Sequence, residues 1–431
     1  MIKKENLIKY FQDGCKTKKQ LKIGVEHEKF LFENKLNKRI DFETVSKIFK
    51  FFEQFGWKPI KEKSRVIALY KEGKSITLEP GNQIELSGAP LNSIHQNCRE
   101  SYEFLDELKK ACKHFDLRMV ATSFDPFSKL ENVPQTPKKR YEIMTNEMPK
   151  NGKLSLEMMY QTCGTQINLD YTSEEDFAKK FKLSTFLVPL STAIFANSPI
   201  KEKKLNGYLS YRSKIWQNTS RGGLPNFFLE DMSFEKYADM AINLPLLFLL
   251  KNGNYIKGEG KTFKDFMEGK ISVIDNEKPN IKDFETHIAT IFTEVRLKKY
   301  IEIRSLDTCE WDCHCSGPAF YTGLLYGALN EALEIINKWN ISDVLNAYID
   351  APKKGFNTTI GNKSLLEWGK IFFYLANKGL KIRSIKNTSD EDETIFLRSI
   401  ESTLNSKSNK AMNAIKNFKK QKNFDFLYEK I

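Results

Sequence analysis

The sequence lacks the long hydrophobic run that a membrane-spanning helix requires, about 20 apolar residues. The apolar stretch at 244–250 is far shorter and contains Pro245. The first six residues include Lys3 and Lys4 and have no apolar segment of the kind that marks a secretory signal. We therefore expect a cytoplasmic protein that makes no contact with a membrane.

Complete motifs for two common chemistries are also missing. Residues 260–262 read Gly-Lys-Thr, like the end of a phosphate-binding P-loop, but Tyr255 stands where that motif has its first glycine. His27 and Glu28 begin the helix pattern of zinc proteases, yet Leu31 occupies the place of the second histidine. These two classes of active site are thereby excluded.

Cysteine is scarce, with seven residues at irregular spacing. An odd and irregular set favours reduced thiols over a disulfide framework. Four potential zinc ligands, Cys309, Cys313, His314 and Cys315, fall within seven residues. Such crowding leaves little freedom for a tetrahedral site, so we favour reduced, partly buried thiols and keep zinc as the alternative.

The chain is basic, with 68 lysines and arginines against 55 acidic residues and a net charge of +13. The lysines are spread along the whole chain, and those at 405–422 fit one solvated helix face. This pattern favours a general lysine bias and suits small anionic substrates. We expect no nucleic-acid partner, although a basic RNA-binding protein stays open as the distant alternative.

The most informative stretch is 23–32, where strand periodicity places Glu26, Glu28 and Phe30 on one face. Two carboxylates so close on a half-buried strand repel each other unless a cation neutralises them. A hard divalent cation such as Mg²⁺, bound through oxygen ligands, is the usual solution. The alternative is an edge strand with an exposed acidic face.

Three more stretches, 75–87, 162–170 and 299–307, alternate in the same way, the first around a Pro-Gly turn. Each gathers polar side chains on one face and mostly apolar ones on the other. The polar sets are Thr77, Glu79, Gln83 and Glu85, then Gln166, Asn168 and Asp170, then Tyr300, Glu302 and Arg304. Together the four stretches predict a sheet whose concave face is a metal site.

These segments resemble the signatures of the glutamate–cysteine ligase family, in the branch shared by plants and proteobacteria. They occur in the family's order across residues 20–330, and the chain beyond about 330 carries none of them. The matching segments are GVEHEKF (24–30), ITLEPGNQIELSGAP (76–90), KKRYEIM (138–144), TCGTQINLD (162–170), ANSPIKEKKLNGYLSYRSKIW (196–216) and FTEVRLKKYIEIRSLD (292–307).

The resemblance implies an α+β fold in which an antiparallel sheet curls into a funnel with helices outside, a glutamine-synthetase-like carboxylate–amine ligase fold. Residues 1–340 would form the catalytic part, and 341–431 a helical extension packed on it within one structural domain. The implied reaction joins the γ-carboxylate of L-glutamate to the amine of L-cysteine with ATP and Mg²⁺, through a γ-glutamyl phosphate, in glutathione biosynthesis. A γ-glutamyl ligase that uses another amine is the nearer alternative, and a homodimer is left open.

The resemblance also implies roles for individual residues. The metal ligands, for two or three Mg²⁺ ions, would be Glu26, Glu28, Glu79, Glu85, Gln166 and Glu302. Arg212 and Arg304 would clamp substrate carboxylate or phosphate as catalytic residues, and Arg140, Tyr141, Asn168 and Arg212 would bind substrate. The alternative for each carboxylate is a strand-face position where a neighbouring lysine or arginine neutralises it. For Arg304 the alternative is a salt bridge to Glu302.

One departure from the family concerns a disulfide. The resemblance implies a redox-responsive disulfide, which many members of this branch carry across the hairpin that follows the Arg212 segment. The two aligned positions here are Gly258 and Val273, so that bridge cannot form. We expect activity not to depend on it.

Helical periodicity predicts most of the remaining elements. Residues 217–232 read as a loop that is a plausible mobile element over the site. The predicted helices are a short one within 1–20, then 42–56, 93–115, 173–196, 233–250, 262–268, 281–291 and 317–338, and the predicted hairpin is 65–70 with 75–79.

Overall fold

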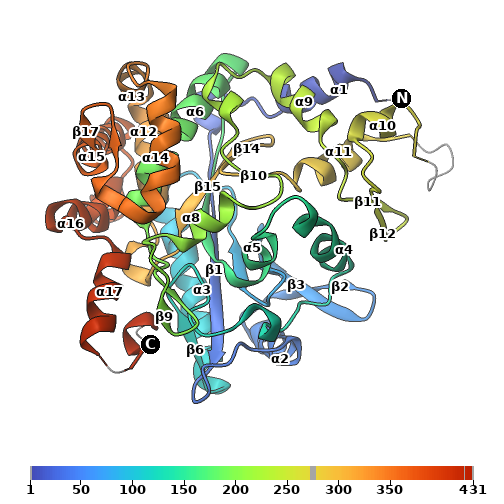
Figure 1. Cartoon of the computed structure of the whole chain (residues 1–431), viewed down its shortest axis with the longest axis horizontal. Helices are drawn as coiled ribbons and strands as arrows, with labels where there is room; N and C mark the ends of the chain where they lie inside the picture. Colours follow the sequence, from blue (N-terminus) through green and yellow to red (C-terminus); the bar gives the residue numbers. More distant parts are fainter. Residues whose placement is uncertain (1, 272–277, 422, 430–431) are drawn as a thin grey trace.

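The computed structural model describes residues 2–271, 278–421 and 423–429, and its centre is a nine-stranded antiparallel sheet (Figure 1). The strand order is β14-β15-β7-β1-β5-β4-β3-β2, and β6 pairs with the second half of β1. The strands are β1 (Ile23–Glu33), β2 (Lys58–Glu62), β3 (Arg65–Lys71), β4 (Lys74–Leu78), β5 (Ile84–Ser87), β6 (Leu117–Val120), β7 (Gly164–Leu169), β14 (Val295–Leu297) and β15 (Ile301–Asp307). The predicted α+β class with an antiparallel sheet is confirmed.

The strand register brings the four polar stretches onto one face. Glu26 on β1 lies opposite Gln166 on β7, and Glu28 lies opposite Glu85 on β5. Glu302 on β15 lies opposite Asn168 on β7. Directly opposed residues of antiparallel strands point to the same side, so these side chains share a face although they are far apart in sequence.

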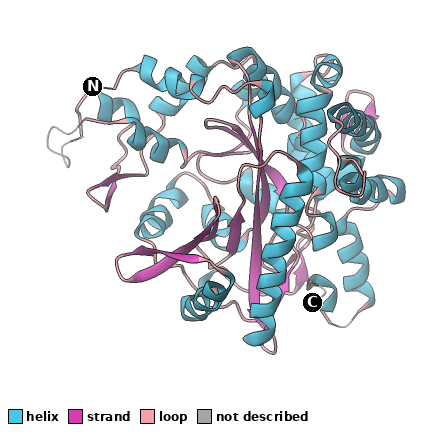
Figure 2. Ribbon diagram, turned by 180° about the vertical axis from the view of Figure 1, so that it is seen from behind, coloured by secondary structure: helices cyan, strands magenta, loops and turns pink. Residues whose placement is uncertain are grey.

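The other face is apolar, and over β3, β4 and β5 it is covered by helices α2 (Phe42–Phe52) and α3 (Ile94–His114) (Figure 2). Asp41 and Ser93 cap these helices through their side chains, which satisfies backbone N–H groups of the first turn. Phe49 of α2 and Leu105 of α3 belong to the same buried cluster as Leu86 of β5. This packing fixes which face of β5 turns toward the polar side.

The C-terminal helices lie together along one side of the sheet (Figure 1). They are α12 (Ser316–Gly327), α13 (Leu329–Ile336), α14 (Ile341–Lys354), α15 (Leu365–Arg383), α16 (Arg398–Ser406) and α17 (Lys410–Lys420). Helices α12 and α15 touch backbone to backbone: a Cβ on Gly323 would lie 2.2 Å from the carbonyl oxygen of Ala376. Glycine is required there because the helices approach so closely.

The remaining helices and short strand pairs lie around the sheet and the C-terminal helices. The helices are α1 (Lys4–Gln12), α4 (Lys139–Glu147), α5 (Ser155–Gln161), α6 (Glu174–Phe186), α7 (Val188–Phe195), α8 (Tyr211–Trp216), α9 (Phe234–Asn243), α10 (Phe263–Met267) and α11 (Ile281–Ile288). The short strand pairs are β8 (Ile200–Lys201) with β9 (Lys204–Leu205), β10 (Gly222–Gly223) with β13 (Phe292–Thr293), β11 (Phe248–Lys251) with β12 (Asn254–Lys257), and β16 (Thr359–Ile360) with β17 (Lys363–Ser364).

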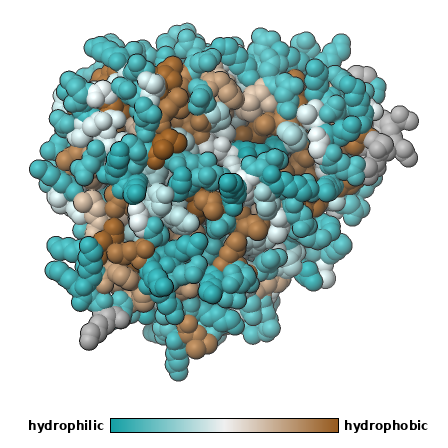
Figure 3. All heavy atoms as spheres, in the orientation of Figure 1, coloured by the Kyte–Doolittle hydropathy of each residue, from teal (hydrophilic) through white to brown (hydrophobic). Residues whose placement is uncertain are grey.

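Hydrophilic residues cover most of the face seen in Figure 3, with small hydrophobic patches between them. Within the described part of the chain, no helix combines the length and the apolar character needed to cross a bilayer.

Four predicted elements are wrong in detail. The helix expected at 317–338 is two helices, α12 and α13, because Ala328 between them leaves the helical conformation. The helix expected at 173–196 is two helices, because Pro189 begins a new one after Leu187. The helix expected at 233–250 ends at Asn243, ahead of Pro245, and 248–251 is strand β11. The expected loop at 217–232 contains β10, which hydrogen-bonds to β13 in parallel.

The expectation of reduced thiols in the 309–315 cluster is also wrong. Cys98 forms a disulfide with Cys315, and Cys309 forms one with Cys313, with Cα atoms 5.9 and 6.2 Å apart. Both distances lie within the range that a disulfide spans. The first bridge joins residues 217 positions apart, so cysteine spacing could not reveal it. With these sulfurs paired, the zinc alternative fails.

The end of the described chain is anchored behind the polar face. Lys29 of β1 forms an ion pair with Glu429 at 2.8 Å, and both side chains are at most 2% exposed. The Glu429 amide donates to the carbonyl of Met119 on β6. A segment 400 positions away in sequence therefore packs directly against the strand that carries Glu28.

Candidate active site

A cavity of about 560 Å³ opens on the polar face of the sheet. Nine of the eleven residues predicted for the site line it: Glu26, Glu28, Glu79, Glu85, Arg140, Tyr141, Gln166, Glu302 and Arg304. The other two, Asn168 and Arg212, lie behind the lining and contact it: Asn168 donates to Glu26, and Arg212 donates to the carbonyl of Arg304.

One half of the cavity is acidic. Burial, and then the neighbouring Glu302, raise the pKa of Glu26 to about 7. Burial is the largest cause that raises the pKa of Glu85 to about 7, and the charge of nearby Glu79 is the second. The same two causes raise the pKa of Glu28 well above its usual value. Buried carboxylates that repel one another hold protons more tightly, because the ionised form lacks solvation and a nearby opposite charge.

The hydrogen bonds to these carboxylates in the described part of the chain come from neutral groups. Gln166 Nε2 donates to Glu28 at 2.8 Å, and the amide N–H of Gly164 donates to its other oxygen at 2.7 Å. Asn168 Nδ2 donates to Glu26 at 2.9 Å, and the Ser87 hydroxyl donates to Glu85. Carboxylate oxygens that form no salt bridge among the described residues are, by their chemistry, a donor set that suits hard divalent cations such as Mg²⁺.

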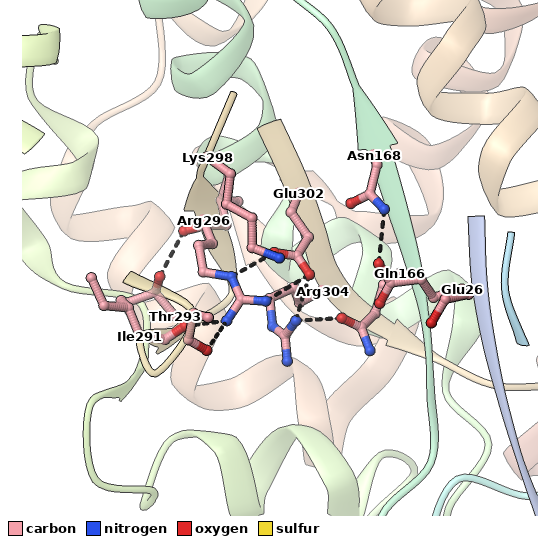
Figure 4. Close-up of polar contacts among 12 residues, drawn as sticks. Glu26, Gln166, Asn168, Ile291, Thr293, Arg296, Lys298, Glu302 and Arg304 are labelled. Atoms are coloured by element: carbon pink, nitrogen blue, oxygen red, sulfur yellow. Dashed lines mark hydrogen bonds and ion pairs between the residues drawn. The ribbon is translucent and has the colours of Figure 1, made fainter. Parts of the chain in front are cut away.

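The other half of the cavity is cationic and is centred on Glu302 (Figure 4). Arg296 Nη2 lies 2.8 Å from Glu302 Oε1, Arg304 Nη1 lies 2.7 Å from the same oxygen, and Lys298 Nζ lies 3.5 Å from Oε2. Burial alone would raise the pKa of Glu302, but these cations hold it well below its usual range. The salt bridge weighed as the alternative for Arg304 is therefore present.

Arg296 is fully engaged in this arrangement. Its Nε and Nη2 meet the two oxygens of Glu302, and its Nη1 donates to the carbonyls of Ala289 and Ile291 just beyond α11. Within the described part of the chain, Arg304 by contrast donates its side-chain hydrogen bonds through Nη1 alone, to Glu302 and to Gln166 Oε1. Arg304 Nε is buried without a hydrogen-bond partner among the described residues, so Arg304 retains donors for a further anion.

Arg212 is held rigidly at the start of α8. The Ser210 hydroxyl caps this helix and donates to Asp307 at 2.9 Å. Arg212 is 2% exposed and packs against Gly164, where a Cβ would lie 2.6 Å from its Nη2. Its Nε and Nη1 are buried without a partner in the described chain. Nε and Nη1 do not share an edge of the guanidinium plane, so Arg212 retains two separate donors rather than one bidentate fork.

Tyr141 and Arg140 occupy the wall beside the Pro-Gly turn. The Tyr141 hydroxyl donates to the carbonyl of Leu78 at 2.6 Å and accepts from Arg140 Nη2 at 3.0 Å. The proton of the Tyr141 hydroxyl is thus used by the protein backbone. Arg140 Nε remains buried and without a partner in the described residues.

Sequence reasoning missed several residues of the cavity, chiefly Arg296, Lys298 and Trp216. The Trp216 ring lies 4.9 Å from the Arg212 guanidinium carbon and 5.1 Å from that of Arg304. Arg296 and Lys298 stand two apart in segment 292–307, and this spacing was the available signal. Arg296 lies on β14, which has only three residues and ends before Lys298, too short for a clear alternation.

Comparison with known proteins agrees with this geometry. The model for "Glutamate-cysteine ligase family 2 (GCS2)" matches residues 22–422. The chain is 40% identical over 393 residues to the chloroplastic glutamate–cysteine ligase of Nicotiana tabacum, covering 90% of this chain and 75% of the relative. It is also 40% identical over 411 residues to the chloroplastic glutamate–cysteine ligase B of Oryza sativa subsp. japonica, covering 94% and 82%.

A solved glutamate–cysteine ligase from Francisella tularensis, in complex with AMP, has a similar fold, with a TM-score of 0.50. It is 12% identical and covers 94% of this chain and 86% of its own. With the family match over nearly the whole chain, the chain belongs to glutamate–cysteine ligase family 2.

Proposed function

We propose that the cavity on the polar face of the sheet is the active site of a glutamate–cysteine ligase. Membership of the family assigns the activity: an ATP-dependent ligation of L-glutamate to L-cysteine in glutathione biosynthesis. The observation that supports this site is the division of one cavity into an acidic half and a cationic half. Amide formation from a carboxylate with ATP needs both, one for metal and one for substrate anions.

The acidic half would hold Mg²⁺ through Glu26, Glu28, Glu79 and Glu85, with Gln166 beside them. Bound there, Mg²⁺ would supply charge neutralisation for the triphosphate as it meets the glutamate carboxylate. We keep two or three ions as the proposed number. Glu302 would be a further ligand through an oxygen lone pair that its arginine partners leave open, since a carboxylate has about four acceptor sites.

The cationic half would act on the transferred phosphoryl group. Arg304 presents unpaired donors next to Lys298, and fixed cations stabilise the negative charge that spreads over the phosphoryl oxygens. Glu302 and Arg296 would hold Arg304 in place. No covalent protein nucleophile is needed, because the phosphoryl group passes directly to the γ-carboxylate to give γ-glutamyl phosphate.

Arg212 would orient the glutamate. Its unpaired Nε and Nη1 would each donate to a substrate oxygen, and the Trp216 ring lies against the guanidinium group. Arg140 would bind a second substrate anion through Nε. The amine of cysteine then attacks the acyl phosphate carbon, the amide bond forms and phosphate leaves with the electrons of the broken C–O bond.

Several finer expectations belong to the same proposal. The sheet would curl so that its polar face becomes the inside of a funnel. Residues 1–340 would form the catalytic part and 341–431 an extension packed on it, in one domain. We keep the cytoplasm as the proposed compartment, although the two plant relatives are chloroplastic. A homodimer remains a proposal.

An ADP-release assay tests the reaction and the acceptor together. Purified protein receives ATP, Mg²⁺ and L-glutamate, and each candidate amine is added in turn. ADP release that requires L-cysteine, with γ-glutamylcysteine identified by mass, is the expected result. Faster turnover with another amino acid would establish the ligase with a different acceptor. No ADP release with any amine, together with salt-dependent RNA binding, would favour the nucleic-acid alternative.

A further inference from the structure

The turn that carries Glu79 is held from outside its own hairpin. Lys138 Nζ donates to the carbonyl of Leu78 at 2.9 Å, beside the Tyr141 hydroxyl. The Thr136 hydroxyl lies 2.6 Å from the carbonyl oxygen of Glu79, and the Thr136 amide donates to the carbonyl of Pro80 at 2.8 Å. The peptide groups on both sides of Glu79 are thus fixed by the segment 136–141.

The next carbonyl of the turn is held as well. Arg39 Nη2 donates to the carbonyl of Gly81, and Arg39 is itself paired with Asp125 at 3.1 Å. The Thr136 hydroxyl also accepts from the amide of Asn82 at 3.1 Å. All four carbonyls from residue 78 to residue 81 therefore accept a hydrogen bond from a residue outside the turn.

These donors are buried, which gives the contacts their weight. Thr136 is 3% exposed and Lys138 is 6% exposed. A lysine so buried is costly unless its ammonium is paired or hydrogen-bonded. Turns of this kind normally lie at the surface, where water satisfies their carbonyls. Here two buried side chains replace the water, and the turn cannot move without breaking their hydrogen bonds.

We infer that Thr136 and Lys138 are positioning residues for Glu79: they fix the peptide units on either side of it, so that its carboxylate stands in the acidic half of the cavity. The inference rests on the proposed function, in which Glu79 is a metal ligand. Neither residue was among the site residues predicted from the sequence. Groups that orient a metal ligand change metal affinity by about 10- to 100-fold when they are removed.

The test measures the affinity of the full-length protein for Mn²⁺ without nucleotide, by electron paramagnetic resonance or calorimetry. Thr136→Val keeps the shape and charge but removes the hydroxyl, and we expect it to weaken Mn²⁺ binding about tenfold. The matched control is Thr185→Val. Thr185 is equally buried and bonds to carbonyls of Phe181 and Lys182, away from the cavity. It should bind Mn²⁺ like the wild type.

Lys138→Met is the second variant, and it separates position from charge. Loss of a cation near Glu79 and Glu85 would by itself tighten Mn²⁺ binding. A positioning role predicts the opposite, weaker binding. The exposed neighbour Lys139, which pairs with Glu142, supplies the control Lys139→Met, which should leave affinity unchanged. Tighter binding in Lys138→Met would overturn the role of Lys138.

Glu79→Gln separates failure of this inference from failure of the proposed site. If Thr136 acts through Glu79, adding Thr136→Val to Glu79→Gln should cause no further loss of affinity, because coupled changes are not additive. Wild-type affinity in Thr136→Val alongside weak binding in Glu79→Gln would overturn the inference alone. Wild-type affinity in Glu79→Gln would remove Glu79 from the metal site, and the inference with it.

Discussion

Arg296 and Glu302 face each other across the β14–β15 ladder, with Arg296 Nη2 lying 2.8 Å from Glu302 Oε1 inside the protein. Both side chains are almost fully buried, at 6% and 0% exposure. Glu302 therefore differs from Glu26, Glu28 and Glu85, whose hydrogen-bond partners in the described chain are neutral. Replacement of Glu302 by glutamine should therefore affect the protein differently from the same replacement at the other acidic residues of the cavity.

Glu85→Gln should nearly abolish turnover and leave the fold intact. The amide keeps the shape of the side chain but removes the charge that a metal ion requires. We expect kcat to fall at least about a thousandfold, equivalent to roughly 4 kcal/mol of barrier. Steady-state ADP release measures it, and circular dichroism checks the fold. Activity within about tenfold of wild type, a loss below ~1.4 kcal/mol, would mean that Glu85 is not a metal ligand.

Glu302→Gln should lose stability as well as activity. It leaves the buried Arg296 without its counter-charge, and breaking a buried ion pair on one side typically costs about 3–5 kcal/mol. Urea unfolding of the metal-free protein measures this cost, with Glu85→Gln as the control that should unfold no more easily than wild type. Equal unfolding midpoints in Glu302→Gln and wild type would argue that the Arg296–Glu302 ion pair contributes nothing to the stability of the fold.

The raised pKa of Glu85 predicts how stability depends on pH in EDTA. Its pKa is about 7 in the fold and about 4.3 when unfolded. A raised carboxyl pKa contributes stability that is fully present below the unfolded value and is lost as the pH rises through the folded value. Wild type should therefore be less stable relative to Glu85→Gln at pH 8 than at pH 5.

Urea unfolding of both proteins at the two pH values tests this sign. Adding Mg²⁺ at pH 8 should restore wild-type stability more than that of Glu85→Gln, because ligand binding to the folded state stabilises it. The comparison uses the difference between the two proteins, so that titrating groups which do not interact with Glu85 cancel. A difference that does not change with pH would contradict the prediction.

Arg212→Lys should be a poor enzyme although the charge is kept. An ammonium cannot reproduce the separate donors that a planar guanidinium holds at fixed positions through Nε, Nη1 and Nη2. We expect the transition-state stabilisation, measured through kcat/KM for glutamate, to fall by about 2–5 kcal/mol. This is the cost of disturbing a buried, hydrogen-bonded charge. The control is Arg99→Lys, at an exposed position of α3. Wild-type kinetics in Arg212→Lys would remove Arg212 from the site.

Strand alternation in the sequence predicted the polar face on which seven of the nine predicted cavity residues lie. The α+β class and the two others, Arg140 and Tyr141 on helix α4, came from the resemblance to the family. Alternation is a local signal, so it works for strands such as β1, with eleven residues, and fails for β14, with three. Contacts between distant segments have no local signal at all. The Lys29–Glu429 ion pair and the Cys98–Cys315 bridge belong to this class, and the sequence predicted neither.

The hairpin position Gly258 also limits what a restored disulfide could do. A Cβ there would lie 2.1 Å from the carbonyl oxygen of Leu246, so Gly258→Cys requires the backbone to shift. Val273, its aligned partner, lies outside the described residues. The expectation that no bridge controls this hairpin stays a prediction. The two disulfides that are present join Cys98 to Cys315 and Cys309 to Cys313, and none of these cysteines lines the cavity.

We therefore predict that dithiothreitol changes turnover less than twofold while lowering stability. Opening the Cys98–Cys315 bridge releases a loop of 217 residues, worth about 5 kcal/mol in the chain-entropy model. Turnover is measured at 25 °C before and after reduction, with urea unfolding in parallel. Intact mass after alkylation in denaturant should count three thiols, Cys15, Cys112 and Cys163, before reduction and seven afterwards. A several-fold change in turnover, with four newly alkylated cysteines, would instead place one of these bridges in control of the active site.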